Sequence, residues 1–183
     1  MEWEGKLVGT HGTPEANPGL CATCHVAAFP TKDATGATFN ATGHVFSAIP
    51  CLVDGLPTPG VDCDDSQRTY AACTGSGCHG NEDVARSARA TAEGRAELLA
   101  GQLNALIAQI PASEFSSTDS RYTVGEGAKF NAELALTPGS AVHNPFLIES
   151  LLIASINEVK KTYGLAVPPR VDLTPVFKLG ASN

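Results

Sequence analysis

Cysteine and histidine recur together in two short motifs in the first half of the chain. The first is Cys-Ala-Thr-Cys-His, in which Cys21 and Cys24 are followed at once by His25. One helical turn between the cysteines presents both thiols along one porphyrin edge, where they can add to the vinyl groups as thioethers, and His25 then lies under the iron as its proximal ligand. A zinc half-site or a redox dithiol uses similar pairs. The adjacent histidine, without a second cysteine pair at matching spacing, favours haem.

The second motif has four residues between its cysteines instead of two. Cys73 and Cys78 are followed by His79, and two of the four intervening residues are glycines. The extra residues must bulge outward if both thiols are to reach one vinyl pair, and glycine supplies the backbone freedom for this. We therefore predict two covalently attached haem c groups per chain. The alternative is that Cys73 and Cys78 belong to disulfides and that His79 is a surface histidine.

Two further cysteines, Cys51 and Cys63, are not followed by histidine. In an oxidising compartment, two leftover cysteines most simply form a disulfide with each other. Pairings that use Cys73 or Cys78 would destroy the second haem motif. We therefore predict a Cys51–Cys63 disulfide.

The distal iron ligands must come from histidine, because the only methionine is Met1. This excludes the usual His/Met ligation and leaves bis-histidine ligation or an open iron. Three histidines lie outside the motifs: His11, His44 and His143. His11 precedes the first motif by a distance that lets the chain loop over the same haem. Two haems need two of these three residues, so one is left over within a monomer.

The elements that must position these residues are predicted to be mostly α-helical. The sequence predicts a single domain, 1–183, whose irregular N-terminal half wraps the haems and whose C-terminal half is two or three helices. Asn81 can begin the first long helix and Pro111 can end it, while Asn144 and Gly164 suit the two ends of the last helix. The predicted parts are an irregular haem-binding region 1–80, a helical region 81–164 with helices near 81–110, 126–136 and 145–163, and an extended tail 165–183.

The tail has two interpretations: it packs on its own domain, or it is an arm that docks on a neighbouring copy. The net charge is −7 over 183 residues and basic residues are scattered, which disfavours a nucleic-acid partner. No apolar run is long enough to span a membrane. Covalent haem attachment takes place outside the cytoplasm, so we expect a secreted protein, extracellular or periplasmic, from which a leader has been removed.

The C-terminal third resembles the end of bacterial multihaem c-type cytochromes. The resemblance is carried by Ala-Lys-Phe-Asn at 128–131 and by Pro-Gly-Ser-Ala-Val-His-Asn-Pro at 138–145. In that family a His-Asn-Pro start to a buried helix often supplies a distal haem ligand, which implies this role for His143. Gly-His-Val-Phe at 43–46 also resembles that group, and the spacing from His11 to Cys21 resembles small bis-histidine cytochromes. The chain departs from the family in having only two haem motifs and in the long spacing of the second.

Bis-histidine ligation fills both axial positions and leaves no place for a substrate, so we predict electron transfer rather than an enzyme. We favour a polymer of this chain that conducts electrons outside the cell, similar to cytochrome filaments, with one distal histidine supplied by a neighbouring subunit. The spare histidine and the apolar tail motivate this hypothesis. The alternatives are a monomeric periplasmic electron carrier that meets redox partner proteins and, less favoured, a dihaem peroxidase.

Overall fold

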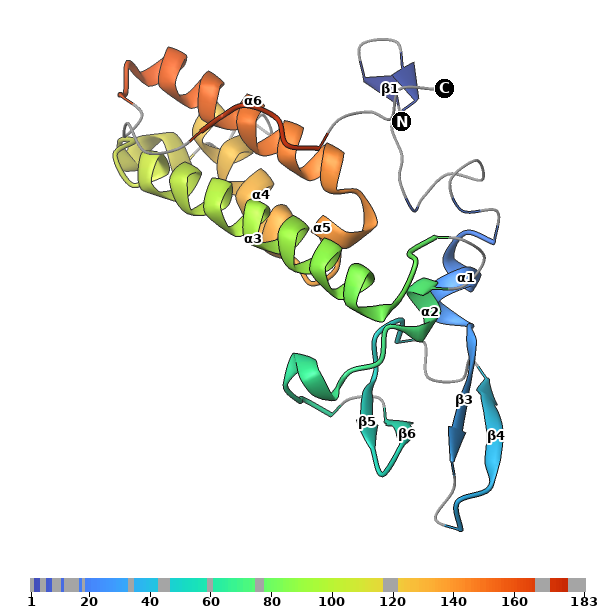
Figure 1. Cartoon of the computed structure of the whole chain (residues 1–183). Coiled ribbons are helices and arrows are strands. Elements are labelled where there is room, and N and C mark those ends of the chain that lie inside the picture. The colour runs from blue at the N-terminus through green and yellow to red at the C-terminus, as the bar shows by residue number, and fades with distance from the viewer. Residues whose placement is uncertain are drawn as a thin grey trace. The chain divides into compact units, whose positions relative to one another are not determined.

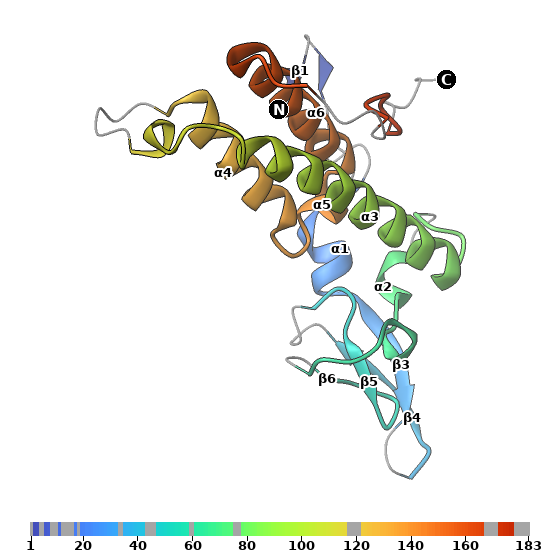
Figure 2. The ribbon, with the colours of Figure 1, turned by 90° about the vertical axis from the view of Figure 1, so that its left-hand side faces the viewer.

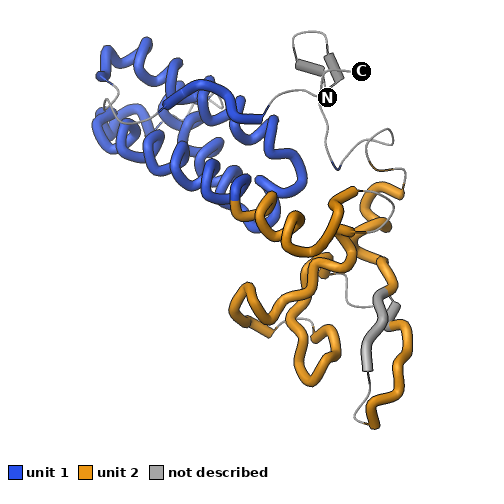
Figure 3. Tube along the Cα trace, viewed as in Figure 1, with its two compact units in different colours: residues 1–11, 91–183 blue, residues 12–90 orange. Residues whose placement is uncertain are grey.

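The computed structural model is mostly helical among the residues that it describes, which confirms the predicted helical class (Figure 1). The chain forms two compact units (Figure 3). We call residues 12–90 the hairpin unit, and residues 1–11 together with 91–183 the helical unit. No helix in the described part of the chain is long and apolar enough to cross a membrane. The described residues are 2–3, 6–7, 11, 17, 19–32, 35–42, 47–58, 61–74, 78–116, 122–166 and 172–177.

The helical unit is built from three long helices that pack around one apolar core (Figure 2). Alanine and leucine side chains of α3 face apolar residues of α4 and α6, and Leu99, Leu103, Leu152 and Ile156 are fully buried. The elements of this unit are β1 (Glu2–Trp3), β2 (Lys6–Leu7), α3 (Glu82–Ile107, which begins in the hairpin unit), the 3₁₀ helix η3 (Ala112–Phe115), α4 (Val124–Leu136), α5 (Ser140–His143) and α6 (Pro145–Tyr163).

The helix ends follow the capping residues of the sequence. Asn81 accepts a hydrogen bond from the Val84 amide at 2.9 Å before α3. The Asn144 side chain likewise accepts a backbone amide hydrogen bond at the start of α6. This helix ends at Gly164, which has a φ of 66°. The helix predicted from residue 126 begins two residues earlier, because Thr123 and Glu126 form a reciprocal capping box.

Residues 172–177 of the tail pack on their own helical unit. The Arg95 side chain donates one hydrogen bond to Glu149, at 2.7 Å, and two to carbonyl oxygens of residues 172 and 174. Glu149 is 2% exposed and accepts the amide N–H groups of Val176 and Phe177 at 3.0 and 2.8 Å. For these residues the first interpretation of the tail is confirmed. Residues 167–171 and 178–183 lie outside the described residues.

The hairpin unit contains regular structure that the sequence analysis did not predict. Two antiparallel hairpins, β3–β4 and β5–β6, lie within the region expected to be irregular. Asp54 and Gly55 both adopt positive φ, 52° and 80°, which is the backbone of the two-residue turn favoured in β-hairpins. The description of 1–80 as irregular was wrong here. The elements are α1 (Cys21–His25), β3 (Ala28–Lys32), β4 (Thr38–Thr42), β5 (Cys51–Val53), β6 (Leu56–Thr58), the 3₁₀ helix η1 (Asp65–Gln67) and α2 (Ala71–Thr74).

Candidate haem-attachment site

The first motif forms α1, a helix of five residues that carries both cysteines and ends at His25. Cys21 is exposed and Cys24 is half-buried, and both thiols are unpaired. The chain enters the helix tightly, because a side chain at Gly19 would collide with the hydroxyl of Thr23. The single helical turn that the spacing predicts is therefore present, with its two thiols one turn apart.

The second motif begins on α2, and its two ends lie close together. Cys73 lies on this four-residue helix, and Cys78 and His79 follow the segment 75–77, which lies outside the described residues. The backbone N–H of His79 donates a hydrogen bond to the carbonyl of Cys73 at 3.2 Å. This bond brings the two ends of the longer motif together. Haem attachment through two thiols and an adjacent histidine requires such an arrangement.

The two motifs lie in the same unit, where α1 packs against α2. Burial, with smaller contributions from nearby Cys24 and Cys78, raises the pKa of Cys73 to about 11. Burial also raises the pKa of Cys24, and Cys78 and Cys21 add to this effect. A reactive redox dithiol requires a lowered thiol pKa. These shifts therefore disfavour that alternative, and they place the thiols of the two motifs within electrostatic reach of one another.

The surroundings of α1 suit a large apolar group. Leu20 and Val26 flank the helix at its two ends and are 39% and 49% exposed. Apolar side chains at these positions could cover a porphyrin face joined to Cys21 and Cys24, so the residues fit the haem that the motif implies. Within the described ranges, no three His, Cys, Asp or Glu side chains form a group that could hold a metal ion. Haem binding does not depend on such a group, because the porphyrin supplies four of the iron ligands.

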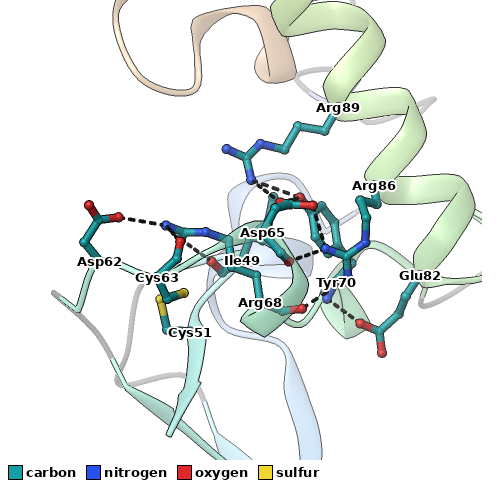
Figure 4. A network of polar contacts seen from close by, with 10 residues as sticks. All are labelled: Ile49, Cys51, Asp62, Cys63, Asp65, Arg68, Tyr70, Glu82, Arg86 and Arg89. Atoms are coloured by element: carbon teal, nitrogen blue, oxygen red, sulfur yellow. Dashed lines mark hydrogen bonds and ion pairs between the residues drawn. A yellow bond between two sulfur atoms is a disulfide. The ribbon is translucent and has the colours of Figure 1, made fainter.

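The predicted disulfide between Cys51 and Cys63 is present, with 6.1 Å between its Cα atoms. Arg68 braces it by donating hydrogen bonds to the carbonyls of Ile49 and Cys63, both at 3.3 Å (Figure 4). The four motif cysteines are all free. The cysteines thus divide into one structural pair and two motif pairs, as the sequence predicts.

A polar network that the sequence analysis missed joins residues that precede the second motif in the sequence to residues that follow it. Figure 4 shows this network. Glu82 accepts hydrogen bonds from the Tyr70 amide at 2.6 Å and from the Thr69 hydroxyl at 3.2 Å. Asp65 accepts from the Tyr70 hydroxyl at 2.6 Å and from Arg86 at 2.6 Å. These bonds hold the pKa of Asp65 below its usual value, the Tyr70 bond contributing most. No short-range pattern signals this network, because its members are up to two dozen residues apart.

Two of the three candidate distal histidines belong to the helical unit. His11 donates its Nδ1–H to the carbonyl of Val142 at 2.7 Å, since a carbonyl can only accept. In the neutral ring this places the lone pair on Nε2, an arrangement typical of metal-binding histidines. His143 ends α5, and its ring lies against Gly139, where an added Cβ would be 3.3 Å from the ring carbon Cε1.

The third candidate, His44, lies outside the described residues. His25 and His79 belong to the hairpin unit, whereas His11 and His143 belong to the helical unit. The assignment of distal histidines to the two irons stays a prediction.

Comparison with known proteins does not add a family or a fold. No family model matches the chain, and no curated protein or solved structure matches it either.

Proposed function

We propose that this chain is a dihaem c-type cytochrome that transfers electrons. The observation that carries the proposal is the arrangement of cysteines in the hairpin unit. The first Cys–Cys–His motif lies on α1, and the second begins on α2, which packs against α1. All four motif thiols are free, while the two cysteines that lack an adjacent histidine form a disulfide. This division of six cysteines matches two covalent attachment sites and one structural cross-link.

The residues have distinct roles in this proposal. The thiols of Cys21 and Cys24 hold one haem and those of Cys73 and Cys78 hold the other, while the histidine that follows each pair binds the iron from the proximal side. When bound, each haem supplies an iron that alternates between the ferric and ferrous states. The chain contributes ligands and burial, which set the reduction potential. The distal ligands are drawn from the three histidines outside the motifs, His11, His44 and His143.

Exchange of electrons within one chain is supported by the closeness of the motifs. Cys78 contributes to the raised pKa of Cys24, and Cys24 contributes to the raised pKa of Cys73. Groups attached at neighbouring thiols can exchange an electron over a short path. We expect a reduced-minus-oxidised titration in two one-electron steps, with an exciton couplet in the Soret circular dichroism if the two porphyrins are neighbours.

Paired cysteine variants test the attachment. The chain is produced with a c-type haem maturation system, and intact mass and pyridine haemochrome spectra count the haems. The wild type should carry two, and Cys21→Ala with Cys24→Ala, or Cys73→Ala with Cys78→Ala, should each leave one. The matched control is Cys51→Ala with Cys63→Ala, which removes the same number of thiols and should leave both haems. A wild-type chain without covalent haem would overturn the proposal.

The assembly state separates two forms of this function. A secreted filament of many copies requires contacts between subunits, whereas a periplasmic carrier works as a monomer. Residues 172–177 are held on their own helical unit by Arg95 and Glu149. This part of the tail is therefore not available to dock on a neighbouring subunit. This observation favours the carrier. Electron microscopy of the haem-containing protein tests it, because ordered filaments would restore the polymer hypothesis.

A further inference from the structure

We propose that Glu82 is a positioning residue that holds the second motif closed, so that Cys73, Cys78 and His79 can engage one haem. This inference rests on the proposed function and concerns one of its two attachment sites. Glu82 does not belong to the motif, and it follows His79 by only three residues. Its role is therefore to act through the backbone that carries the ligands.

Two nested closures define the segment that contains the second motif. The inner one is the hydrogen bond from the His79 amide to the Cys73 carbonyl at 3.2 Å. The outer one is the hydrogen bond from the Tyr70 amide to Glu82 Oε2 at 2.6 Å, which joins the residue before α2 to the first residue of α3. The outer bond keeps the two ends of the segment close together, and this lowers the entropic cost of forming the inner bond.

Tyr70 is a firm anchor for this closure. It is 1% exposed, and its hydroxyl donates to Asp65 at 2.6 Å and accepts from Arg89 at 2.9 Å (Figure 4). The Arg86 guanidinium lies 4.6 Å from the centre of its ring. Tyr70 is therefore fixed by its side chain on one side and by Glu82 through its backbone on the other. A shift of Glu82 would be transmitted to Cys73, three residues further on.

A carboxylate suits this position for two reasons. One oxygen, Oε2, receives both the Tyr70 amide and the Thr69 hydroxyl, and charge-assisted hydrogen bonds are stronger than neutral ones. Glu82 is also the first residue of a helix of 26 residues, where the helix dipole favours a negative charge. Glutamine keeps an acceptor oxygen but loses the charge, and alanine loses both.

The first motif does not depend on a closure of this kind. Cys21 and Cys24 are one turn apart on α1, so the helix itself sets the distance between their thiols. Loss of Glu82 should therefore affect the two attachment sites unequally. This selectivity distinguishes positioning of the second motif from a general loss of folding.

The test compares Glu82→Ala and Glu82→Gln with a matched control, Glu114→Ala. Glu114 is also half-buried and accepts a 2.6 Å hydrogen bond, from the Tyr163 hydroxyl, but it lies in the helical unit. Intact mass counts the haems, and peptide mapping identifies the cysteines that carry them. For Glu82→Ala we expect a fall from two haems to one, with Cys73 and Cys78 left as free thiols.

The conservative variant separates positioning from a requirement for charge. Glu82→Gln should keep the second haem in a larger fraction of chains than Glu82→Ala does, with a shifted reduction potential for that haem alone. Glu114→Ala should keep both haems at unchanged potentials. Two haems at unshifted potentials in Glu82→Ala would overturn the inference, as would an equal loss from both motifs. A wild-type chain without haem would overturn the proposed function itself, so the two failures are distinguishable.

Discussion

The buried ion pair between Arg95 and Glu149 offers a quantitative test of how the tail is held. Glu149→Ala removes a carboxylate that is 2% exposed and leaves the Arg95 guanidinium, 10% exposed, without its charged partner. It also removes the acceptor of two tail amides, those of Val176 and Phe177. The substitution thus breaks contacts within the helical unit and contacts of the tail at once.

The size of the effect follows from these contacts. Removing one partner of a buried ion pair costs about 3–5 kcal/mol. Arg95 keeps its hydrogen bonds to two carbonyl oxygens of the tail, at 2.9 and 3.0 Å, so the lower end of this range applies. We expect Glu149→Ala to lower the unfolding free energy of the helical unit by about 3 kcal/mol, or roughly a hundredfold in the equilibrium constant.

Urea unfolding followed by far-ultraviolet circular dichroism measures this loss, and limited proteolysis reports release of the tail. The control is Glu133→Ala, which removes an exposed ion pair with Lys129 on α4 and should cost less than about 1 kcal/mol. Replacing both partners with apolar residues, Arg95→Met with Glu149→Leu, should cost less than Glu149→Ala alone. Equal unfolding midpoints for Glu149→Ala and Glu133→Ala would refute the reasoning, as would a tail that stays protected in both.

Two further predictions concern the candidate ligand His143 and the network at Asp65. Gly139→Ala and Gly164→Ala both place a side chain at a positive φ, 86° and 66°, which costs about 1–2 kcal/mol in each case. Only the first crowds the His143 ring, so visible spectra should show high-spin haem in Gly139→Ala but not in Gly164→Ala; matching spectra would argue against this role of Gly139. Hydrogen bonding from Tyr70 lowers the pKa of Asp65. The stabilisation that Asp65 provides is therefore complete above the ordinary pKa of about 3.9 and is lost as the pH falls through the lowered pKa. Acid unfolding should therefore be shallower in Asp65→Asn, and an unchanged acid limb would contradict this.

The helices could be predicted from the sequence because their signals are local. The helix ends are marked in the sequence by the capping residues Asn81, Asn144 and Gly164. Apolar residues recur at helical spacing within the helices. The start of α4 was predicted two residues too late, because Thr123 lies in a polar Ser/Thr segment that is typical of a loop. Its capping partner Glu126 lies only three residues away, so this signal was present.

The hairpin unit was harder to predict, although Asp54-Gly55 between two apolar stretches is a hairpin signal. The motif spacing predicted the turn of α1 and an outward bulge of the extra residues in the second motif. The means of closure could not be predicted, because Tyr70 and Glu82 meet only after the chain has folded back. Pairing of Arg95 with Glu149 is similar, since 54 residues separate them. Contacts of this kind depend on tertiary packing, which local patterns do not encode.

The Cys51–Cys63 disulfide has a consequence for maturation. Six free thiols can pair in fifteen ways, whereas four can pair in three. A cross-link that spans only 12 residues closes early in an oxidising compartment, because a short loop is quickly searched. In the proposed cytochrome, closure of this disulfide would withdraw two competitors from the thiols that must stay reduced until haem is attached. The bond would thereby limit the number of wrong disulfides open to the four motif cysteines before the proposed haems are attached.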